Sequence, residues 1–266
     1  MDRIPAKFYK YRAINPNTEA IFTRNQLYFA PPTAFNDPFD SAFHVVMEGR
    51  ANQMVVESLA FQQIRRDRPE FSLREAVEAA QQVGAAIVEQ RLEEFRAISV
   101  EKLARDTNDM VGILSLSEKN DDLLMWSHYA DCHRGICLEF STSQPSFFQG
   151  ALPVNYGDEF PALNLHEIVL DETLRNTAPW MLMKARQWEY EKEWRVLDFE
   201  CGPGPKAFPR DALTAVVLGC RITDEYRKKV SSWLQTRGCN TVLYQARQVA
   251  GHFRLSIEPL PSTKEA

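Results

Sequence analysis

The chain lacks the features that indicate secretion, a membrane or a disulfide framework. Its five cysteines, at positions 132, 137, 201, 220 and 239, include no Cys-x-x-Cys pair and are odd in number. Reduced cytoplasmic thiols are the simplest interpretation. The first residues, Met1 to Pro5, contain no apolar run typical of a signal peptide. No stretch approaches the roughly 18 apolar residues of a spanning helix. We therefore expect a cytoplasmic protein that does not enter the membrane.

An excess of positive charge is also missing. With 31 Lys and Arg against 36 Asp and Glu, the net charge is −5. This argues against a broad electrostatic surface for nucleic acid, although a local basic groove stays possible. There is no Walker A loop, no Gly-x-Gly-x-x-Gly, no His-Glu-x-x-His and no Gly-x-Ser-x-Gly. The simplest kinase, dehydrogenase, zinc protease and serine hydrolase interpretations are thereby removed. His128 and His133 are poorly spaced as metal ligands on one helix, so no metal site is expected.

Short alternating or apolar runs predict strands along most of the chain. They cover residues 8–12, 26–30, 110–117, 135–140, 154–156, 196–199, 213–219, 240–244 and 253–257. Helices are predicted at 121–129, at 165–183 with a break at Pro179, and at 223–237. Residues 261–266 are expected to fray. The pattern predicts an α+β fold in one domain, 1–266, built on a single mixed, mainly antiparallel sheet.

Residues 51–105 differ from the rest of the chain because they contain no strand signal. Ser72 and Glu75 form a capping box, and Ala76 to Phe95 follow with apolar residues at helical spacing. We interpret this stretch as a helical insertion of two or three helices, serving as a lid or as a surface for a partner protein.

The segment from Lys184 to Arg195 contains two Trp, one Tyr, three Glu and two Arg. It is too polar for a core and too aromatic for a solvated face. Glu191 and Glu193 stand at the mouth of a predicted strand, between large flat side chains. This arrangement suits a site that binds a planar ligand and stabilises positive charge. The alternative is a surface strand with cross-strand ion pairs and a Trp anchor.

Several motifs occur together between about residues 8 and 220. They are Tyr9-Lys10-Tyr11-Arg12, Leu27-Tyr28-Phe29, Phe35 to Asp40, Ser115-Leu116-Ser117, Leu124 to Ala130, His133 to Phe140, Val154-Asn155-Tyr156, Lys184 and Trp188 to Arg195. In combination they resemble the bacterial family called domain of unknown function 2971. The family name implies no activity.

A second, remote resemblance concerns the order of three motifs. Arg12 on a first strand, Ser115 and Ser117 on a middle strand and Glu191-x-Glu193 at a late strand are similar to the Arg-Ser-Glu type of ADP-ribosyltransferase. The resemblance implies a fold of that type with NAD as a substrate. The chain departs from that family in having Ser-Leu-Ser in place of Ser-Thr-Ser and a Trp directly after Glu193.

The resemblance also implies roles for individual residues. A guanidinium binds pyrophosphate, aromatic faces stack on planar rings, and a carboxylate stabilises an oxocarbenium ion. Glu193, Glu191 and Ser117 are therefore expected to be catalytic, with Glu193 stabilising the cation and Glu191 orienting the acceptor. The residues expected to bind NAD are Arg12, which would hold its phosphate, Tyr11, Ser115, His128, Tyr129 and Tyr190.

The leading hypothesis is transfer of ADP-ribose from NAD to a macromolecular acceptor, protein or nucleic acid, by a bacterial toxin or phage-defence effector. A first alternative is a metal-dependent nuclease or other phosphodiester enzyme, with Asp37, Asp40, Glu191, Glu193 and Lys184 around the metal. A second alternative is a non-enzymatic interaction module. Its Trp/Tyr/Arg-rich surface would then be a binding hot spot, and residues 51–105 would be the partner face.

Overall fold

The computed structural model describes residues 3–46, 49–90, 92–143, 147–164, 174–238 and 240–260. The predicted fraying of residues 261–266, Cys239, and residues 165–173 of the predicted helix 165–183 lie outside the described residues. Among the described helices, none is long and apolar enough to cross a membrane.

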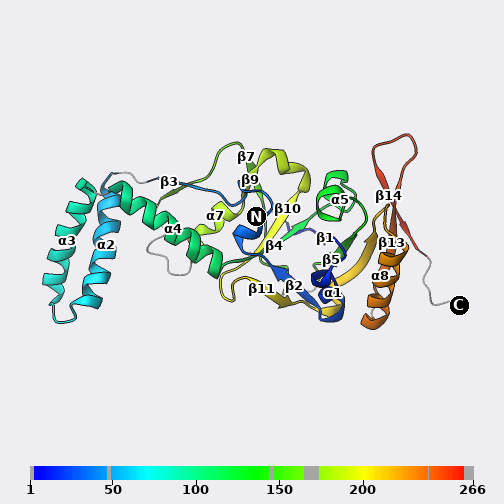
Figure 1. Ribbon diagram of the computed structural model, residues 1–266, viewed down its shortest axis with the longest axis horizontal. Helices are drawn as coiled ribbons and strands as arrows, with labels where there is room; N and C mark the ends of the chain where they lie inside the picture. Colours follow the sequence, from blue (N-terminus) through cyan, green and yellow to red (C-terminus); the bar gives the residue numbers. More distant parts are fainter. Residues whose placement is uncertain are drawn as a thin grey trace.

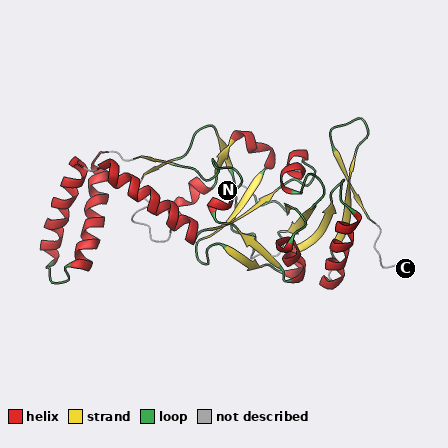
Figure 2. Cartoon of the chain, viewed as in Figure 1, coloured by secondary structure: helices red, strands yellow, loops and turns green. Residues whose placement is uncertain are grey.

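An eight-stranded sheet lies at the centre of the molecule (Figures 1 and 2). Its strands are β1 (Lys7–Arg12), β4 (Gly112–Ser117), β5 (Ile136–Ser141), β6 (Ala151–Pro153), β10 (Glu193–Asp198), β12 (Leu213–Leu218), β13 (Val242–Gln248) and β14 (Leu255–Pro259). Their spatial order is β14-β13-β12-β5-β1-β4-β10-β6. Neighbours are antiparallel except β12 and β13, which are parallel. The predicted α+β class with a mixed, mainly antiparallel sheet is confirmed.

Smaller elements surround this sheet in the described part of the chain. The short strands pair as β2 (Gln26–Phe29) with β11 (Gly204–Ala207), β3 (His44–Val46) with β8 (Ala162–Asn164), and β7 (Asn155–Gly157) with β9 (Met183–Ala185). The α-helices are α1 (Pro16–Thr23), α2 (Gly49–Asp67), α3 (Leu73–Gln90), α4 (Leu92–Met110), α5 (Leu123–Tyr129), α7 (Ala178–Met181) and α8 (Asp224–Arg237). The 3₁₀ helices are η1 (Pro32–Ala34), η2 (Arg175–Thr177), η3 (Arg186–Glu191) and η4 (Arg210–Ala212).

Capping residues explain where the two helices beside the sheet begin and end. Asp122 precedes α5, and its carboxylate accepts hydrogen bonds from the backbone N–H groups of Leu124 and Met125. The Thr223 hydroxyl caps α8 in the same way. Gly238 then ends α8 at a φ of 63°, a conformation that glycine adopts without strain. These local signals set the start of α5, which contributes Met125 and Tyr129 to the pocket described below, and both ends of α8, which connects β12 to β13 in the chain.

The core is divided between the two faces of the sheet. Phe8, Leu138 and Phe140 belong to one buried cluster, and Cys137 and Trp126 belong to another. Strand β5 therefore buries alternate side chains on both faces, as its near-continuous apolar sequence predicts.

The predicted insertion forms three helices, α2, α3 and α4, over residues 49–110. Figure 1 shows α2 and α3 as an antiparallel pair that stands away from the sheet, with α4 leading back to it. We call α2 and α3 the helical arm. Gly84 allows close packing in the arm, because a Cβ there would lie 2.5 Å from Cγ of Glu57. The predicted capping box is confirmed, since the Ser72 N–H donates to the Glu75 carboxylate over 2.8 Å.

Two differences between the predicted elements and the described residues concern the chain around the site. The strand predicted at 196–199 begins earlier, at Glu193, which places this carboxylate inside the sheet. Residues 174–183 of the predicted long helix instead form η2, the four-residue α7 and the start of β9. Pro179 lies in the first turn of α7, where its missing N–H is tolerated, so it begins a helix and does not break one.

Candidate functional site

The candidate site arises because two strands of the sheet diverge. Strand β1 pairs with β5 from Lys7 to Arg12, and β4 pairs with β10 along its whole length. Strands β1 and β4, however, are in register at a single pair, Tyr9 with Ser117. Where they separate, the Lys10 ammonium donates a hydrogen bond to the Ser115 carbonyl over 2.8 Å. A pocket of about 320 Å³ opens at this place, and β1, β4 and β10 all contribute to its lining.

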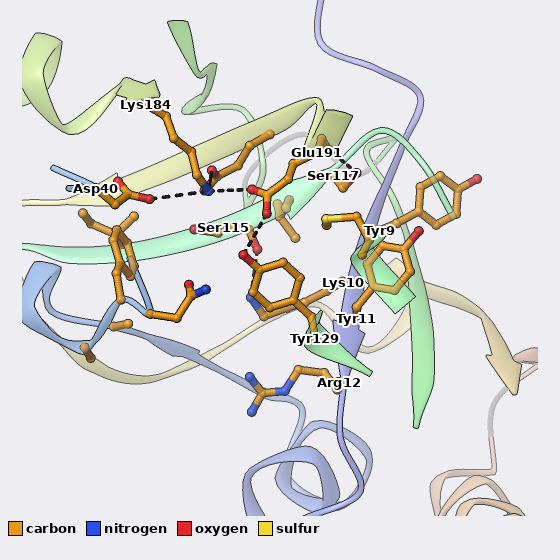
Figure 3. Close-up of a pocket in the computed structure, with 18 of the residues that line it drawn as sticks. Tyr9, Lys10, Tyr11, Arg12, Asp40, Ser115, Ser117, Tyr129, Lys184 and Glu191 are labelled. Carbon is orange, nitrogen blue, oxygen red and sulfur yellow. Dashed lines mark hydrogen bonds and ion pairs between the residues drawn. The ribbon is translucent and has the colours of Figure 1, made fainter. Parts of the chain in front are cut away.

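One side of the pocket is cationic. Lys10 and Arg12 both line it, and Figure 3 shows Arg12 on the opposite side of Tyr129 from Glu191 and Lys184. The Arg12 Nε is buried and has no hydrogen-bond partner, and burial lowers the pKa of this guanidinium. Burial, together with the charge of Arg12, lowers the pKa of Lys10 to about 7, against the opposing effect of Glu193. Buried donors are almost always satisfied, so this unpartnered guanidinium nitrogen favours an anionic ligand.

The other side of the pocket is a buried ionic network around Lys184. Its ammonium lies 2.5 Å from Glu191, 2.9 Å from Glu193 and 3.5 Å from Asp40. Arg195 adds a second cation, with contacts of 2.8 Å to Glu193 and 2.7 Å to Asp40. These side chains are at most 5% exposed. Burial by itself lowers the pKa of Lys184, but the three carboxylates outweigh it and the net shift is upward.

The two glutamates differ in their electrostatic surroundings. Burial tends to raise the pKa of Glu193, but the charges of Arg195 and Lys184 outweigh it and lower the pKa to about 2. Glu191 has its pKa raised by burial, because Lys184 is its only cationic partner among the described residues and Glu193 repels it. The Tyr129 hydroxyl donates to Glu191 over 2.7 Å. Figure 3 shows this contact and the one from Lys184 to Glu191.

Backbone contacts hold Glu191, the last residue of η3, and the turn that leads from it to Glu193 at the start of β10. The Ser117 hydroxyl donates to the Glu191 carbonyl over 2.6 Å and accepts from the Lys119 N–H over 3.0 Å. The residue between the glutamates, Lys192, has a φ of 45°. Such a left-handed residue redirects the chain within one step. Ser117 therefore contributes to the site by fixing the backbone that carries Glu191.

Most of the predicted site residues come together in the pocket, and two do not. The residues that line it are Tyr11, Arg12, Ser115, Ser117, Tyr129, Glu191 and Glu193. Among the described residues, the pocket lining includes neither His128 nor Tyr190. Both instead have their rings about 6 Å from the Trp188 ring, at 5.9 Å and 6.0 Å. Their rings thus pack against Trp188 and do not line the cavity.

Sequence reasoning missed Lys10 and did not anticipate the role of Arg195. A signal for Lys10 was present, because residues two apart on a strand share a face and Arg12 was already a candidate. Arg195 carried the same signal, because it lies two residues after Glu193 on β10 and pairs with it, but its second partner, Asp40, lies 155 positions away. Asp40 and Lys184 are motif residues of the first resemblance and parts of the alternative metal site, but the sequence did not predict their ion pairs with the glutamates and Arg195.

The described residues do not favour the metal centre of the phosphodiester alternative. Among the described residues, no three His, Cys, Asp or Glu side chains are arranged to hold a metal ion. The Lys184 ammonium already lies among Asp40, Glu191 and Glu193, where a metal would have to bind. Asp37 is engaged elsewhere, because it accepts from the Trp188 indole N–H over 2.6 Å.

Comparison with known proteins shows that part of the chain is similar to a known family. Residues 125–196 match the model of a protein family of unknown function, DUF2971. The match confirms the first resemblance over this segment, which carries Tyr129, Lys184, Glu191 and Glu193. No curated protein and no solved structure matches the chain. The resemblance to ADP-ribosyltransferases has no support from these comparisons and stays a prediction.

Proposed function

We propose that this chain transfers ADP-ribose from NAD to a macromolecular acceptor, acting in bacteria as a toxin or phage-defence effector. One observation carries the proposal. Arg12, the Ser115–Ser117 pair and Glu193 come from β1, β4 and β10, which are neighbours in the sheet, and all of them line one pocket. The order Arg, Ser, Glu along the chain thus corresponds to a single cluster in space.

The charge distribution of the pocket supports this substrate. Lys10 and Arg12 offer a cationic side for phosphate, and the unpartnered Arg12 Nε offers a buried donor for a phosphate oxygen. The Tyr129 ring lies between this side and the carboxylates (Figure 3). The volume is at the lower end of the roughly 300–1,000 Å³ of ligand pockets, so it suits one nucleotide half of NAD. The other half would extend to the surface.

The carboxylate side suits the bond that must break. Cleavage of the bond between ribose C1′ and nicotinamide leaves the electron pair on nicotinamide and positive charge on the ribose. An ionised carboxylate beside C1′ stabilises that charge. Glu193 remains ionised at neutral pH because of its lowered pKa, and Lys184 fixes it relative to Glu191. We assign charge stabilisation to Glu193 and orientation of the acceptor to Glu191.

The test is a thermal-shift titration with NAD, combined with an assay of nicotinamide release. A ligand at 100 times its dissociation constant stabilises the folded state by about 2.7 kcal/mol. We expect this saturable shift in the native chain and its loss in Arg12→Ala. Arg24→Ala, an exposed arginine in the same region of the chain, is the matched control and retains the shift. Glu193→Gln is expected to bind NAD without releasing nicotinamide.

The same titration separates the alternatives. A missing NAD shift together with magnesium-dependent cleavage of nucleic acid, lost in Glu191→Ala, would replace the proposal by the phosphodiester enzyme. If no ligand produces a thermal shift and the chain forms a stable complex with a protein in a pull-down, the result would support the second alternative, a non-enzymatic interaction module.

A further inference from the structure

The C-terminal part of the chain has a charge opposite to that of the whole. Residues 219–260 contain seven Lys and Arg but only three Asp and Glu, in a chain whose net charge is −5. This segment includes α8, β13 and β14, at one edge of the eight-stranded sheet. Of the seven cations, Arg237 is buried, and Lys229 and Arg247 are paired with Glu225 and Glu258, so the local excess of positive charge lies on the other three arginines and one lysine. Such a local excess on an acidic protein attracts polyanions.

The strand register places part of this basic segment at the same end of the sheet as Arg12. Arg12 is opposite Ile136 on β5, and Ile136 is opposite Leu218, the last residue of β12. Leu218 is in turn opposite Gln245, and β13 continues three residues further, to Gln248. At about 3.3 Å per residue, this extension alone reaches roughly 10 Å beyond β12. Figure 1 shows the β13–β14 hairpin projecting from the body of the molecule.

The tip of this hairpin is ordered and carries an aromatic ring in solvent. Phe253 is fully exposed. The tip is closed by hydrogen bonds from the Val249 N–H to the Arg254 carbonyl and from the His252 N–H to the Val249 carbonyl. Gly251 supplies the left-handed residue that the turn requires, with a φ of 75°. Because the turn is closed by backbone hydrogen bonds and the Phe253 ring lies in water, this ring adds no buried apolar area to the fold.

Two exposed arginines accompany the ring. Arg254 follows Phe253 directly, and Arg221 lies just after β12 at the same end of the sheet. Neither guanidinium forms an ion pair or a hydrogen bond with a described residue, whereas Arg247 on the hairpin stem is paired with Glu258 over 2.9 Å. Arg221 and Arg254 are therefore available to an external anion.

We propose that this end of the sheet docks single-stranded nucleic acid, with Phe253 stacking on a base and Arg221 and Arg254 contacting phosphates. Stacking platforms flanked by cations are how proteins bind single strands without reading their sequence. A single exposed ring offers too little apolar surface to anchor a membrane. The inference rests on the proposed function and names its acceptor class: the nucleic acid would be held at the end of the sheet where Arg12 lines the pocket.

Fluorescence anisotropy with a labelled 20-nucleotide RNA of mixed sequence tests the docking surface without NAD. Single-stranded DNA and duplex RNA of the same sequence serve as further probes. Phe253→Ala is expected to weaken RNA binding about tenfold, since the variant loses the stacking of one base. In the Arg221→Ala/Arg254→Ala double variant, the slope of the logarithm of the RNA-binding constant against the logarithm of salt concentration is expected to fall in magnitude by about 1.4, or about 0.7 per lost contact.

Phe39→Ala and Arg74→Ala are the control variants. They remove an exposed ring and an exposed arginine elsewhere, and should bind RNA as the native chain does.

Equal binding by the native chain and Phe253→Ala, or no binding to any of these probes, would overturn the inference. Binding to anionic lipid vesicles in place of RNA would overturn it as well. The NAD thermal shift, measured on the same variants, should be unchanged in Phe253→Ala. RNA binding without any NAD shift would refute the proposed function but support the docking surface. An NAD shift without RNA binding would support the proposed function but refute the docking surface.

Discussion

Glu193 is a buried carboxylate whose charge is matched by two cations, Lys184 and Arg195. Glu193→Gln removes the charge but keeps the shape, and leaves both cations with one carboxylate partner fewer. Breaking a buried ion pair costs about 3–5 kcal/mol, so we expect a loss of roughly 3 kcal/mol in the free energy of unfolding at pH 7, measured with urea.

The pH dependence of this loss follows from the lowered pKa. Because the pKa of Glu193 is about 2 in the folded chain, below that of an unfolded Glu, its stabilising contribution is present above about pH 4.3. That contribution is lost as the pH falls through 2. The difference between the native chain and Glu193→Gln should therefore shrink on acidification. A difference that is constant between pH 7 and pH 3 would show that the charge is not responsible.

The chemistry of single residues could be predicted from the sequence more readily than their partners. Arg12 and Glu193 were expected at a site because a guanidinium and a carboxylate near aromatic residues suit phosphate and developing cations. That Lys184 also neutralises Glu193 could not be expected, because these two side chains meet only after β9 and β10 take their places, whereas Arg195 lies on the same strand as Glu193. His128 was expected to line the cavity. On α5, however, the adjacent residue Tyr129 lines it and His128 does not.

At the scale of elements, the site depends on close packing between the end of β1 and the turn before β5. A Cβ added to Gly135 would lie 2.2 Å from the Arg12 carbonyl oxygen, and backbone cannot move aside as a side chain can. Gly135→Ala should displace the end of β1, reduce stability by about 1–3 kcal/mol and weaken the NAD thermal shift through Arg12. Gly150→Ala is the matched control, because a Cβ there would meet nothing within 4 Å.

Urea unfolding and the NAD titration together test this packing. A Gly135→Ala variant that is as stable as Gly150→Ala, or that has lost stability but keeps full NAD affinity, would contradict the link between this glycine and the position of Arg12.

The elements also show where sequence patterns stop being informative. Apolar runs predicted β4, β5 and β12 because buried strands are continuous in hydrophobicity. The divergence of β1 from β4, which creates the pocket, has no sequence signal, since both strands keep a regular pattern and only their pairing changes. Strand order likewise depends on contacts between residues more than 70 positions apart, such as Ser117 with Glu193.

At the scale of the whole molecule, the helical arm is separate from the sheet that carries the pocket. Val55 and Val56 of α2 and Ala76 and Ala80 of α3 are buried within the arm (Figure 1). Leu103 of α4 packs with Ile113 of β4, so α4 belongs to the body. The boundary between the two parts therefore lies between α3 and α4, inside the insertion that the sequence predicted as one block.

Replacing residues 49–90 by a short Gly-Ser linker tests this division. Units that share few contacts contribute independently to stability, so the shortened chain should still unfold in one cooperative transition. Its NAD thermal shift should equal that of the native chain, because no residue of the arm lines the pocket in the described part of the structure. Calorimetry measures the unfolding transition, and the NAD titration measures the thermal shift.

Loss of the NAD shift in a cooperatively folded, shortened chain would mean that the arm acts as a lid on the pocket. Loss only of a pull-down partner would assign the arm to protein recognition, and the exposed side chains of Met54, Leu73 and Val83 would be its contact surface.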